Sequence, residues 1–281
     1  LNTCFEMKIN TNMAAQAAGL SVIKNERFTH EAMHRLSTGI KINSATDDAA
    51  GWTISSKMTT NLQSMQQALR NTHNGISMLE TAASAATEMG NMGQRARELT
   101  LQGISDSSTP AQKAMMQNEV DEMLKAIQNI AHDTQYNNIN LLDGSSSSMH
   151  IQVGTLAGQT FDVSISSLTL EALNLDGLDI ISNPSEALAK TDAAVTAITN
   201  AQAKFGVDVG LLNQSLETLM TGSLSFEAAR GRIIDADYAS DTTTLASKTI
   251  MGQAAIAMVS QANQKPTTVH HLLKMEGSKQ L

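Results

Sequence analysis

The most constraining feature of this sequence is a pair of long stretches in which apolar residues recur at alternating spacings of four and three. The first has the seam Met58, Leu62, Met65, Leu69, Thr72, Ile76, Leu79, Ala83 and Ala86. The second keeps a similar register through Ala187, Thr191, Ala194, Ile198, Ala201, Phe205, Asp208, Leu212 and Leu219. This spacing places one narrow apolar stripe along a helix, which suits packing against other helices. We therefore expect the chain to fold back on itself.

Composition favours a thin bundle over an ordinary globule. Aromatic residues make up only 3% of the 281 residues, and Met, Ala and Leu supply most of the apolar ones. Such small or flexible side chains suit helices that each bury a narrow stripe. The predicted fold class is mainly α, an elongated antiparallel helical bundle or coiled coil with one small β-hairpin.

Charge and hydropathy exclude several functional classes. The formal net charge is −8, and no basic stripe offers a track for phosphates, so no nucleic-acid partner is expected. No stretch approaches the roughly 20 apolar residues of a membrane span, so no membrane insertion is expected. The N-terminal residues lack the apolar core of a secretory signal, which predicts another route if the protein leaves the cell. Cys4 is the only cysteine, so an intramolecular disulfide is impossible.

Capping residues and glycines predict where the first helices begin and end. A helix is expected over about 12–37, ended by Gly39, with a stripe that runs through Ile9, Met13, Ala17 and Leu20 and resumes at Met33 and Leu36. The segment 39–51 is the first expected linker, and Asp47 or Asp48 can cap the long helix that follows. After Ala86 the seam of that helix slips to Met89, Met92, Ala96 and Leu99. Such a stutter rotates the contact face.

Three further helices and a hairpin are expected downstream. Thr109-Pro110-Ala111-Gln112 is a strong helix start for the stripe Met116, Val120, Met123, Ile127 and Ile130. Asn183-Pro184-Ser185-Glu186 repeats this signal for a fourth helix, which is expected to break near Gly222 and Ser223. The last helix is expected to continue to Pro266, with one shallow face formed by Met251, Ala254, Ala255, Met258 and Ala262. The alternation of Met149, Ile151 and Val153 with polar residues, matched by Phe161, Val163 and Ile165, predicts a β-hairpin near 149–166.

No pattern of residues predicts a catalytic, cofactor or metal site. His30 and His34 stand four apart beside Glu31, which is the spacing of a two-histidine metal site, but no third ligand falls on that face and a solvated surface is favoured. Asp47 and Asp48 are better suited to capping than to acid–base chemistry. The serines at 145–148 have no histidine partner in a catalytic arrangement, and the linker at 39–51 has no phosphate-loop lysine.

The sequence motifs at both ends of the chain resemble those of bacterial flagellins, the subunits of the flagellar filament. MKINTNMAAQAAGLSVIKNE and RLSTGIKINSATDDAAGW stand at the N-terminal end, and ARGRIIDADYASDTTTLASKTIMGQAAIAMVSQANQKP stands at the C-terminal end. Between them MGQRARELTLQG, YNNINLLDG and IQVGTLAGQTFDVSI are also similar to the family. The resemblance covers about Met7 to Lys274.

The resemblance implies a structural, non-enzymatic protein that self-assembles for motility. Residues 7–45 and 229–274 are then the paired terminal helices of an inner tube, and 46–228 form the surrounding bundle with its hairpin. Residues 1–6 and 275–281 are atypical tails. Only the segment at about 167–183 separates the hairpin from the descending helix, so the chain resembles a short flagellin without variable outer domains. The resemblance fits the flagellin of a polar filament and that of a lateral filament equally.

The resemblance also implies partners and a location outside the cell, in the flagellum. The expected partners are further copies of the chain, the flagellar type III export apparatus with a secretion chaperone, hook-associated and cap proteins, and the host Toll-like receptor for flagellin. The receptor-recognition stretch of the family matches Gln94, Arg95, Leu99 and Glu119, where an arginine beside an exposed leucine would anchor an interface. Self-assembly is assigned to Ile9, Met13, Leu20, Met251, Ala254, Ala255 and Met258.

We expect folding of the ends to be coupled to assembly. The segments up to about 37 and from about 232 have polar interruptions and shallow faces, so ordering them costs more than a single chain recovers. Two other classes remain as alternatives. One is a hook–filament junction (hook-associated) protein, which shares the terminal helices but usually diverges from the flagellin motifs DDAAG and QAN. The other is a chemoreceptor-like signalling coiled coil, which the hairpin and the absence of a membrane span disfavour.

Overall fold

The computed structural model describes residues 11–105 and 108–277, with side chains up to residue 267. Within these residues it contains α1 (Met13–Thr38), α2 (Ala49–Ile104), α3 (Pro110–Asp133), β1 (Gln135–Tyr136), β2 (Ile139–Asn140), β3 (Met149–Gln152), β4 (Thr160–Val163), α4 (Pro184–Ile234) and α5 (Tyr238–Gly277). The mainly α class is therefore confirmed. The chain divides into two compact units: a terminal unit, residues 1–59 with 228–281, and a central unit, residues 60–227.

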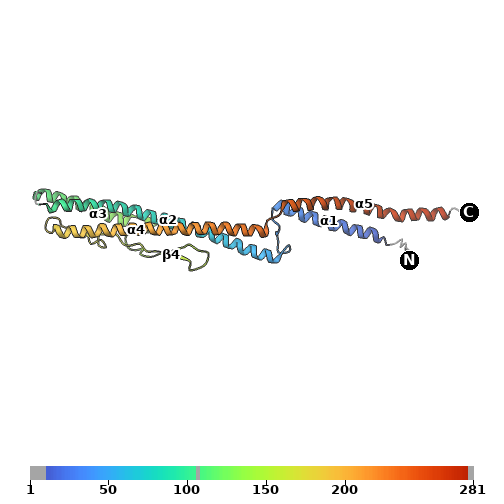
Figure 1. Ribbon diagram of the computed structural model, residues 1–281, viewed down its shortest axis with the longest axis horizontal. Helices are drawn as coiled ribbons and strands as arrows, with labels where there is room; N and C mark the ends of the chain where they lie inside the picture. The colour runs from blue at the N-terminus through green and yellow to red at the C-terminus, as the bar shows by residue number, and fades with distance from the viewer. Residues whose placement is uncertain (1–10, 106–107, 278–281) are drawn as a thin grey trace. The chain divides into compact units, whose positions relative to one another are not determined.

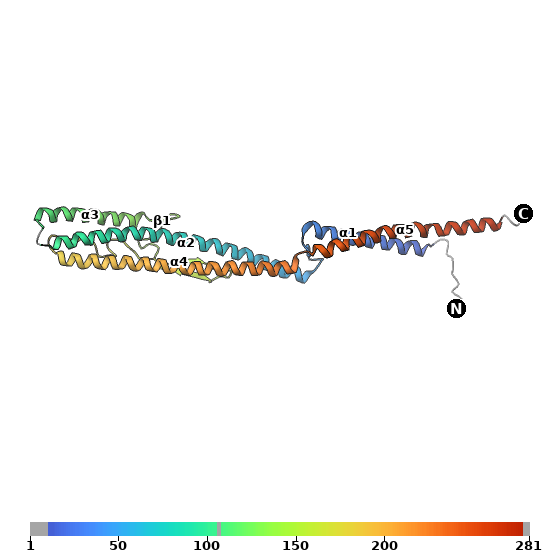
Figure 2. The same ribbon diagram turned by 45° about the horizontal axis from the view of Figure 1, so that its top comes forward.

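In the terminal unit, α1 and α5 lie side by side and antiparallel (Figures 1 and 2). The amide of Asn12 donates to the carbonyl of Ala262 at 2.8 Å, and the hydroxyl of Tyr238 donates to the carbonyl of Leu36 at 2.9 Å. Asn12 also caps α1, because its side-chain oxygen accepts from the backbone N–H of Ala15. Gly39 ends the helix with a φ of 71°, a left-handed conformation that glycine adopts without strain.

The seam between α1 and α5 differs from the expected stripe. The residues with reduced exposure include Ala15, Ala18, Val22, Asn25, Thr29, Ala32 and Leu36 on α1, and Leu245, Lys248, Gly252, Ala255, Val259 and Ala262 on α5. The expected stripe was wrong, because Met13, Leu20 and Met33 are exposed. Small residues let two helices approach closely: a Cβ on Gly252 would lie 4.0 Å from the Cβ of Asn25. The helices therefore meet mainly through small and polar residues, with four larger aliphatic side chains among them: Val22, Leu36, Leu245 and Val259.

In the central unit, α2 and α3 pack beside α4 with the β3–β4 hairpin alongside (Figures 1 and 2). The carbonyl of Ala86 accepts from the amide of Gln202, which ties α2 to α4 at 2.8 Å. Most of the predicted seam is buried: Leu62, Thr72, Ile76, Leu79 and Ala86 on α2, and Ala187, Thr191, Ala194, Ile198, Ala201, Phe205 and Leu212 on α4. Beyond Ala86 the core continues through Met89, Ala96 and Leu99, with Met92 partly buried, while Thr100 stays buried in the register of Leu79 and Ala86.

The predicted start of α3 is confirmed as a capping box. The hydroxyl of Thr109 accepts from the backbone N–H of Gln112, and the side chain of Gln112 accepts from the backbone N–H of Thr109 at 2.8 Å. Each half of the box satisfies a backbone donor that the first helical turn leaves free. Proline at the first helical position completes the signal.

Two small antiparallel sheets are present where one hairpin was expected. β3 and β4 form the predicted hairpin as an antiparallel pair, with Ile151 opposite Phe161. The additional pair, β1 and β2, is closed by Asn137 and Asn138 at φ values of 50° and 61°. Two adjacent asparagines with positive φ suit the two-residue turn of a short hairpin. The sequence signal for this hairpin was present in YNNIN but was missed.

The connector from β4 to α4 contributes to the core without regular structure. It buries Ile165, Leu168, Leu173, Leu175, Leu178 and Ile180. The side chain of Gln117 on α3 holds its backbone, since it donates to the carbonyl of Leu178 and accepts from the N–H of Ile180, both at 2.8 Å. These bonds satisfy peptide groups that would otherwise be buried without partners.

Two predicted helix ends were wrong. α4 continues through Gly222 to Ile234, because a single glycine costs a helix only about 1 kcal/mol and packing offsets this. The break comes at residues 235–237, where the Ala236 N–H bonds to the carbonyl of Gly39. α5 continues through Pro266 to Gly277. A proline removes one helical hydrogen bond and kinks or weakens a helix without necessarily ending it.

Candidate functional sites

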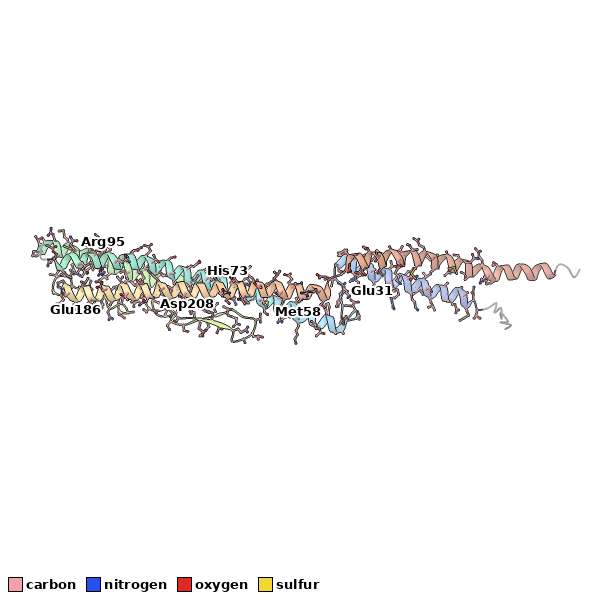
Figure 3. All side chains as sticks on the ribbon, in the orientation of Figure 1. Glu31, Met58, His73, Arg95, Glu186 and Asp208 are labelled. Carbon is pink, nitrogen blue, oxygen red and sulfur yellow. The ribbon has the colours of Figure 1, made fainter. Side chains whose placement is uncertain are left out.

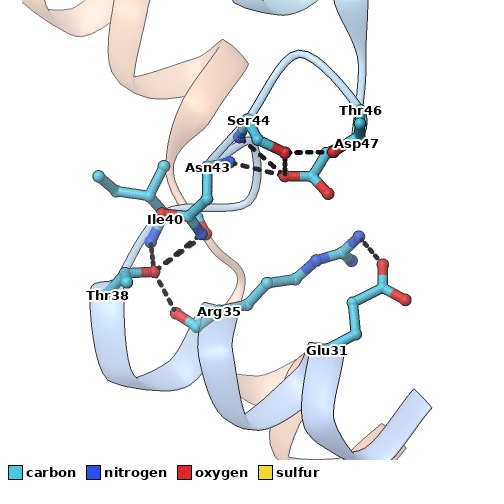
Figure 4. A network of polar contacts seen from close by, with 8 residues as sticks. All are labelled: Glu31, Arg35, Thr38, Ile40, Asn43, Ser44, Thr46 and Asp47. Carbon is cyan, nitrogen blue, oxygen red and sulfur yellow. Dashed lines mark hydrogen bonds and ion pairs between the residues drawn. The ribbon is translucent and has the colours of Figure 1, made fainter. Parts of the chain in front are cut away.

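The loop between α1 and α2 is held by a polar network within the terminal unit (Figure 4). One carboxylate oxygen of Asp47 accepts from the backbone N–H groups of Asn43 and Ser44 at 3.0 and 2.9 Å. The bond from the Ser44 N–H is the main cause that lowers the pKa of the Asp47 carboxyl. Asp48 caps α2 instead, because its side chain accepts from the N–H of Ala50. The predicted capping role is thus confirmed for Asp48, while Asp47 orders the loop.

The same network borders a shallow polar hollow that includes the two histidines of α1. Its lining consists of Arg27, His30, Glu31, His34, Arg35, Asn43, Ser44, Thr46 and Asp47. Glu31 is engaged by Arg35, whose guanidinium lies 2.5 Å from the carboxylate. Among the described residues, no group of three or more His, Cys, Asp or Glu side chains has a geometry that could hold a metal ion. The hollow therefore gives no support to a metal site.

The outward surfaces of α1 and α5 carry large apolar side chains. The exposed ones are Met13, Leu20, Ile23, Phe28 and Met33 on α1, and Ile250, Met251, Ile256 and Met258 on α5. At about 100° per residue, Ile250, Met251 and Ile256 point in three different directions around α5. The pair thus buries mainly small and polar residues between its helices and exposes most of its larger apolar ones to its surroundings.

The residues assigned to self-assembly fall into three groups. Met13, Leu20, Met251, Ala254 and Met258 are exposed on the outward surfaces. Ala255 is half-buried in the seam between α1 and α5. Ile9 lies outside the described residues. Sequence spacing alone did not separate the outward residues from the seam, because α5 offers apolar residues on several sides.

A second candidate site surrounds Arg95 at the surface of α2, where it is labelled in Figure 3. Its guanidinium bonds to the carboxylate of Glu98 at 3.1 Å and to that of Glu119 on α3 at 3.2 Å. Bonds to Glu98 first, and then to Glu119, raise the pKa of Arg95. Gln94 is also exposed. The cluster thus presents one arginine, two carboxylates and an amide across two helices.

Leu99 does not belong to this surface. Its side chain is only 3% exposed and lies in the central core. The expectation of an exposed leucine beside the arginine was therefore wrong, whereas the expected place of Leu99 on the seam of α2 is confirmed. Leu99 stands three residues after the buried Ala96 and next to the buried Thr100, so it falls on the core side of α2.

No helix in the described part of the chain is long and apolar enough to cross a lipid bilayer.

Two protein-family models match the chain. Residues 9–147 match the bacterial flagellin N-terminal helical region, and residues 188–273 match the bacterial flagellin C-terminal helical region.

Relatives of similar length are found among curated proteins. The chain is 32% identical over 272 residues to a flagellin from Halalkalibacterium halodurans, an alignment that covers 95% of this chain and 100% of that protein. It is 31% identical over 306 residues to a flagellin from Bacillus subtilis, with 95% and 100% covered. A solved structure assigned to a flagellar hook-associated protein of Vibrio parahaemolyticus has a TM-score of 0.59 at 14% identity, and covers 67% of this chain and 100% of that one. At that identity, the likeness concerns the fold alone.

Proposed function

Because the chain belongs to the bacterial flagellin family and is a structural, non-enzymatic subunit of the extracellular flagellar filament, we propose that its copies contact one another through the outward apolar side chains of α1 and α5. Membership of the family implies polymerisation into a filament. The full-length relatives are flagellins, which decides against a hook–filament junction protein or a chemoreceptor fragment. The proposal concerns which residues make the contacts.

The observation that carries the proposal is where the large apolar side chains of the α1–α5 pair lie: most of them are on the outer surface of the pair and few are in its seam. Most of its seam residues are Ala, Gly, Asn or Thr, joined by Val22, Leu36, Leu245, Lys248 and Val259, whereas the described Met and Ile side chains of both helices lie outward. Burying one such large side chain stabilises by about 1.5–3 kcal/mol, far more than burying an alanine. The pair alone therefore gains little from folding, and neighbouring copies supply the missing burial.

The distribution of these side chains fits several neighbours at once. Apolar residues on three sides of α5 favour a helix that is surrounded, as in the interior of a tube. Repeated heterologous contacts that do not close produce a helical filament. On this basis we assign residues 7–45 and 229–274 to the inner tube and 46–228 to the bundle around it. The tail at 1–6 lies outside the described residues, and of the tail at 275–281 only 275–277 are described, as the end of α5.

A matched pair of charge substitutions tests this assignment. Met258 on α5 and Met115 on α3 have the same exposure of 62%, so Met258→Glu and Met115→Glu change the monomer surface alike. We expect Met258→Glu to abolish filaments in electron microscopy and sedimentation, because a carboxylate without a partner is costly to bury. Circular dichroism should show a folded central unit in both variants. Normal filaments from Met258→Glu would contradict the proposal, and equal loss in both variants would indicate a general effect of charge.

Ala254 and Ala255 separate the two sides of α5. Ala254→Glu places a charge on the outward surface and should block assembly while α1 and α5 still pair. Ala255→Glu places it in the seam and should weaken the pairing itself. Cross-linking yield between cysteines introduced on α1 and α5 distinguishes the two outcomes.

We assign recognition by the host Toll-like receptor for flagellin to Gln94, Arg95 and Glu119, with Leu99 as the buried support of this surface. Support comes from the matched family stretch and from the exposed arginine, a residue type enriched among interface anchors. Arg95→Ala should weaken receptor binding by monomeric protein, whereas Arg70→Ala, an exposed arginine on the same helix, should not. Binding by filaments should be weaker if neighbouring subunits cover this surface. Unchanged affinity of Arg95→Ala would contradict the assignment.

The remaining partners follow from family membership rather than from a surface of this chain. They are the flagellar type III export apparatus with its secretion chaperone, and the hook-associated and cap proteins. Appearance of the chain in the medium of cells with the apparatus, and not of cells without it, tests the export route.

A further inference from the structure

The sixteen methionines of the chain differ widely in exposure. In the terminal unit four described methionines are exposed, between 45% for Met33 and 69% for Met13, with Met251 and Met258 in the same range. In the central unit Met115 and Met220 are comparably exposed. Met78 and Met89, by contrast, are in the core at 4% and 0%. An oxidant in solution can therefore reach the exposed methionines of both the terminal and the central unit, whereas Met78 and Met89 in the core are protected.

We propose that the four terminal methionines, Met13, Met33, Met251 and Met258, are sites of reversible two-electron oxidation by peroxide, and that their oxidation stops the chain from joining a filament. This inference rests on the proposed assembly surface. The thioether sulfur attacks one peroxide oxygen, the O–O bond breaks and an S–O bond forms. Sulfur loses two electrons to give methionine sulfoxide, and the second oxygen leaves as water, so hydrogen peroxide is the only co-reactant.

The effect on assembly follows from the polarity of the product. A sulfoxide is a polar acceptor on a side chain that was apolar, and it disrupts surfaces built from methionine. Met251 and Met258 are seven residues apart, so one side of α5 would carry two such groups. In a filament each would be buried without an assured donor. An unsatisfied buried acceptor of this kind weakens association by on the order of tenfold.

The location of these residues makes oxidation selective for the free subunit. Side chains at contacts between copies are covered once a filament forms, so their sulfur atoms lose access to the oxidant. Oxidation would then act on chains before they assemble and spare those already in place. Methionine sulfoxide is reducible by sulfoxide reductases, so the block can be reversed.

The test treats monomers and filaments with hydrogen peroxide and measures the 16-dalton mass increase of each methionine peptide. In monomers the four terminal methionines should oxidise at least tenfold faster than Met78 and Met89. Oxidised chains should need at least a tenfold higher concentration to polymerise, and reductase treatment should restore assembly. In filaments the four should be protected. Unchanged polymerisation after their full oxidation would overturn the proposal.

Two sets of leucine substitutions supply the controls, since leucine has a similar volume and no sulfur to oxidise. The quadruple variant Met13→Leu, Met33→Leu, Met251→Leu and Met258→Leu should assemble after peroxide treatment. The double variant Met115→Leu and Met220→Leu should remain sensitive. Loss of assembly by the treated quadruple variant would overturn the proposal. Met258→Glu separates a failure of the assembly surface from a failure of the oxidation proposal. If the Met258→Glu variant assembles, the proposed assembly surface is wrong. If that variant does not assemble but fully oxidised wild-type chains do, only the oxidation proposal is wrong.

Discussion

At the scale of single residues, two helical glycines illustrate how differently the same residue type is used. A Cβ added to Gly103 on α2 would lie 2.3 Å from the Cγ2 of Ile180, whose side chain is fully buried. A Cβ on Gly206 of α4 would have no described atom within 4 Å. The first glycine therefore permits a close contact with the connector, whereas the second has no packing role within one chain.

We expect Gly103→Ala to lower the free energy of unfolding by about 1–3 kcal/mol, because the new methyl group forces the buried side chain of Ile180 to shift. Gly206→Ala is the matched control and should raise it by about 0.4–1 kcal/mol through the reduced entropy of the unfolded chain. Urea unfolding of the monomer measures both. A stabilised Gly206→Ala variant that fails to polymerise would reveal a close contact between copies, and a stable Gly103→Ala variant would show that the connector can shift.

Two carboxyl groups of the central unit are predicted to respond to pH in opposite directions. Asp208 lies on the seam of α4 (Figure 3), and one of its carboxylate oxygens is buried without a hydrogen-bond partner in the described structure. Burial raises its pKa, and the nearby Lys204 only partly offsets this. Asp143 lies in the loop after β2. Its carboxylate accepts hydrogen bonds from the hydroxyl and the backbone N–H of Ser145 and from the side-chain amide of Asn140. These bonds lower the pKa of Asp143 to about 2.

A raised pKa in the fold means that the charged form of Asp208 is penalised at neutral pH, so Asp208→Asn should raise Tm there. The gain should shrink as the pH falls through the folded pKa, because the wild-type carboxyl then becomes neutral. Asp143→Asn should do the opposite and lower Tm at neutral pH, since its stabilisation is present above about 3.8 and disappears as the pH falls towards 2. Thermal unfolding between about pH 2 and 7 measures both. A Tm difference of the same sign in both variants would contradict this account.

At the scale of elements, helix starts depended on local chemistry and could be read from the sequence. The capping box of α3 and the Asn12 cap of α1 involve residues within three positions of one another. Such contacts form whatever the rest of the chain does. Helix ends were less predictable, because α4 passes Gly222, where a single glycine costs the helix only about 1 kcal/mol and does not end it.

Thr109→Ala should destabilise the central unit by about 1 kcal/mol, because the N–H of Gln112 loses its acceptor. Thr109→Ser is the matched control, as it keeps the hydroxyl, and should remain within a few tenths of wild type. The difference in urea midpoint at constant slope gives the value. Equal stability of the alanine variant would mean that water or the residues before α3 take over the cap.

At the scale of the whole molecule, the two units should differ in how they depend on assembly. The central unit has a continuous apolar core, whereas the terminal unit fully buries only a few small or polar side chains along α1 and α5. Ordering costs roughly 1–2 kcal/mol per residue in both. We therefore expect fast amide exchange for α1 and α5 in the monomer and slow exchange in the filament, with α2 and α4 of the central unit protected in both. Strong protection of α1 and α5 at monomer concentrations would contradict coupled folding.

The sequence by itself determined the family, the mainly α class, the long seams of α2 and α4, the capped helix starts and the β3–β4 hairpin. Each of these rests on signals that are local or repeat with a fixed period. The exposed Arg95 could be anticipated in the same way, because a charged side chain beside a core stripe remains at the surface.

Only the tertiary structure decided which apolar residues face inward. Leu99 turned out to be buried, and Met13 and Leu20 turned out to lie outside the α1–α5 seam. Periodicity reveals that a helix has an apolar side but does not reveal whether the same chain or another copy covers it. On α1 and α5 the small and polar residues allow the closest approach within one chain. The larger apolar side chains are therefore left for neighbours, a division that spacing alone does not contain.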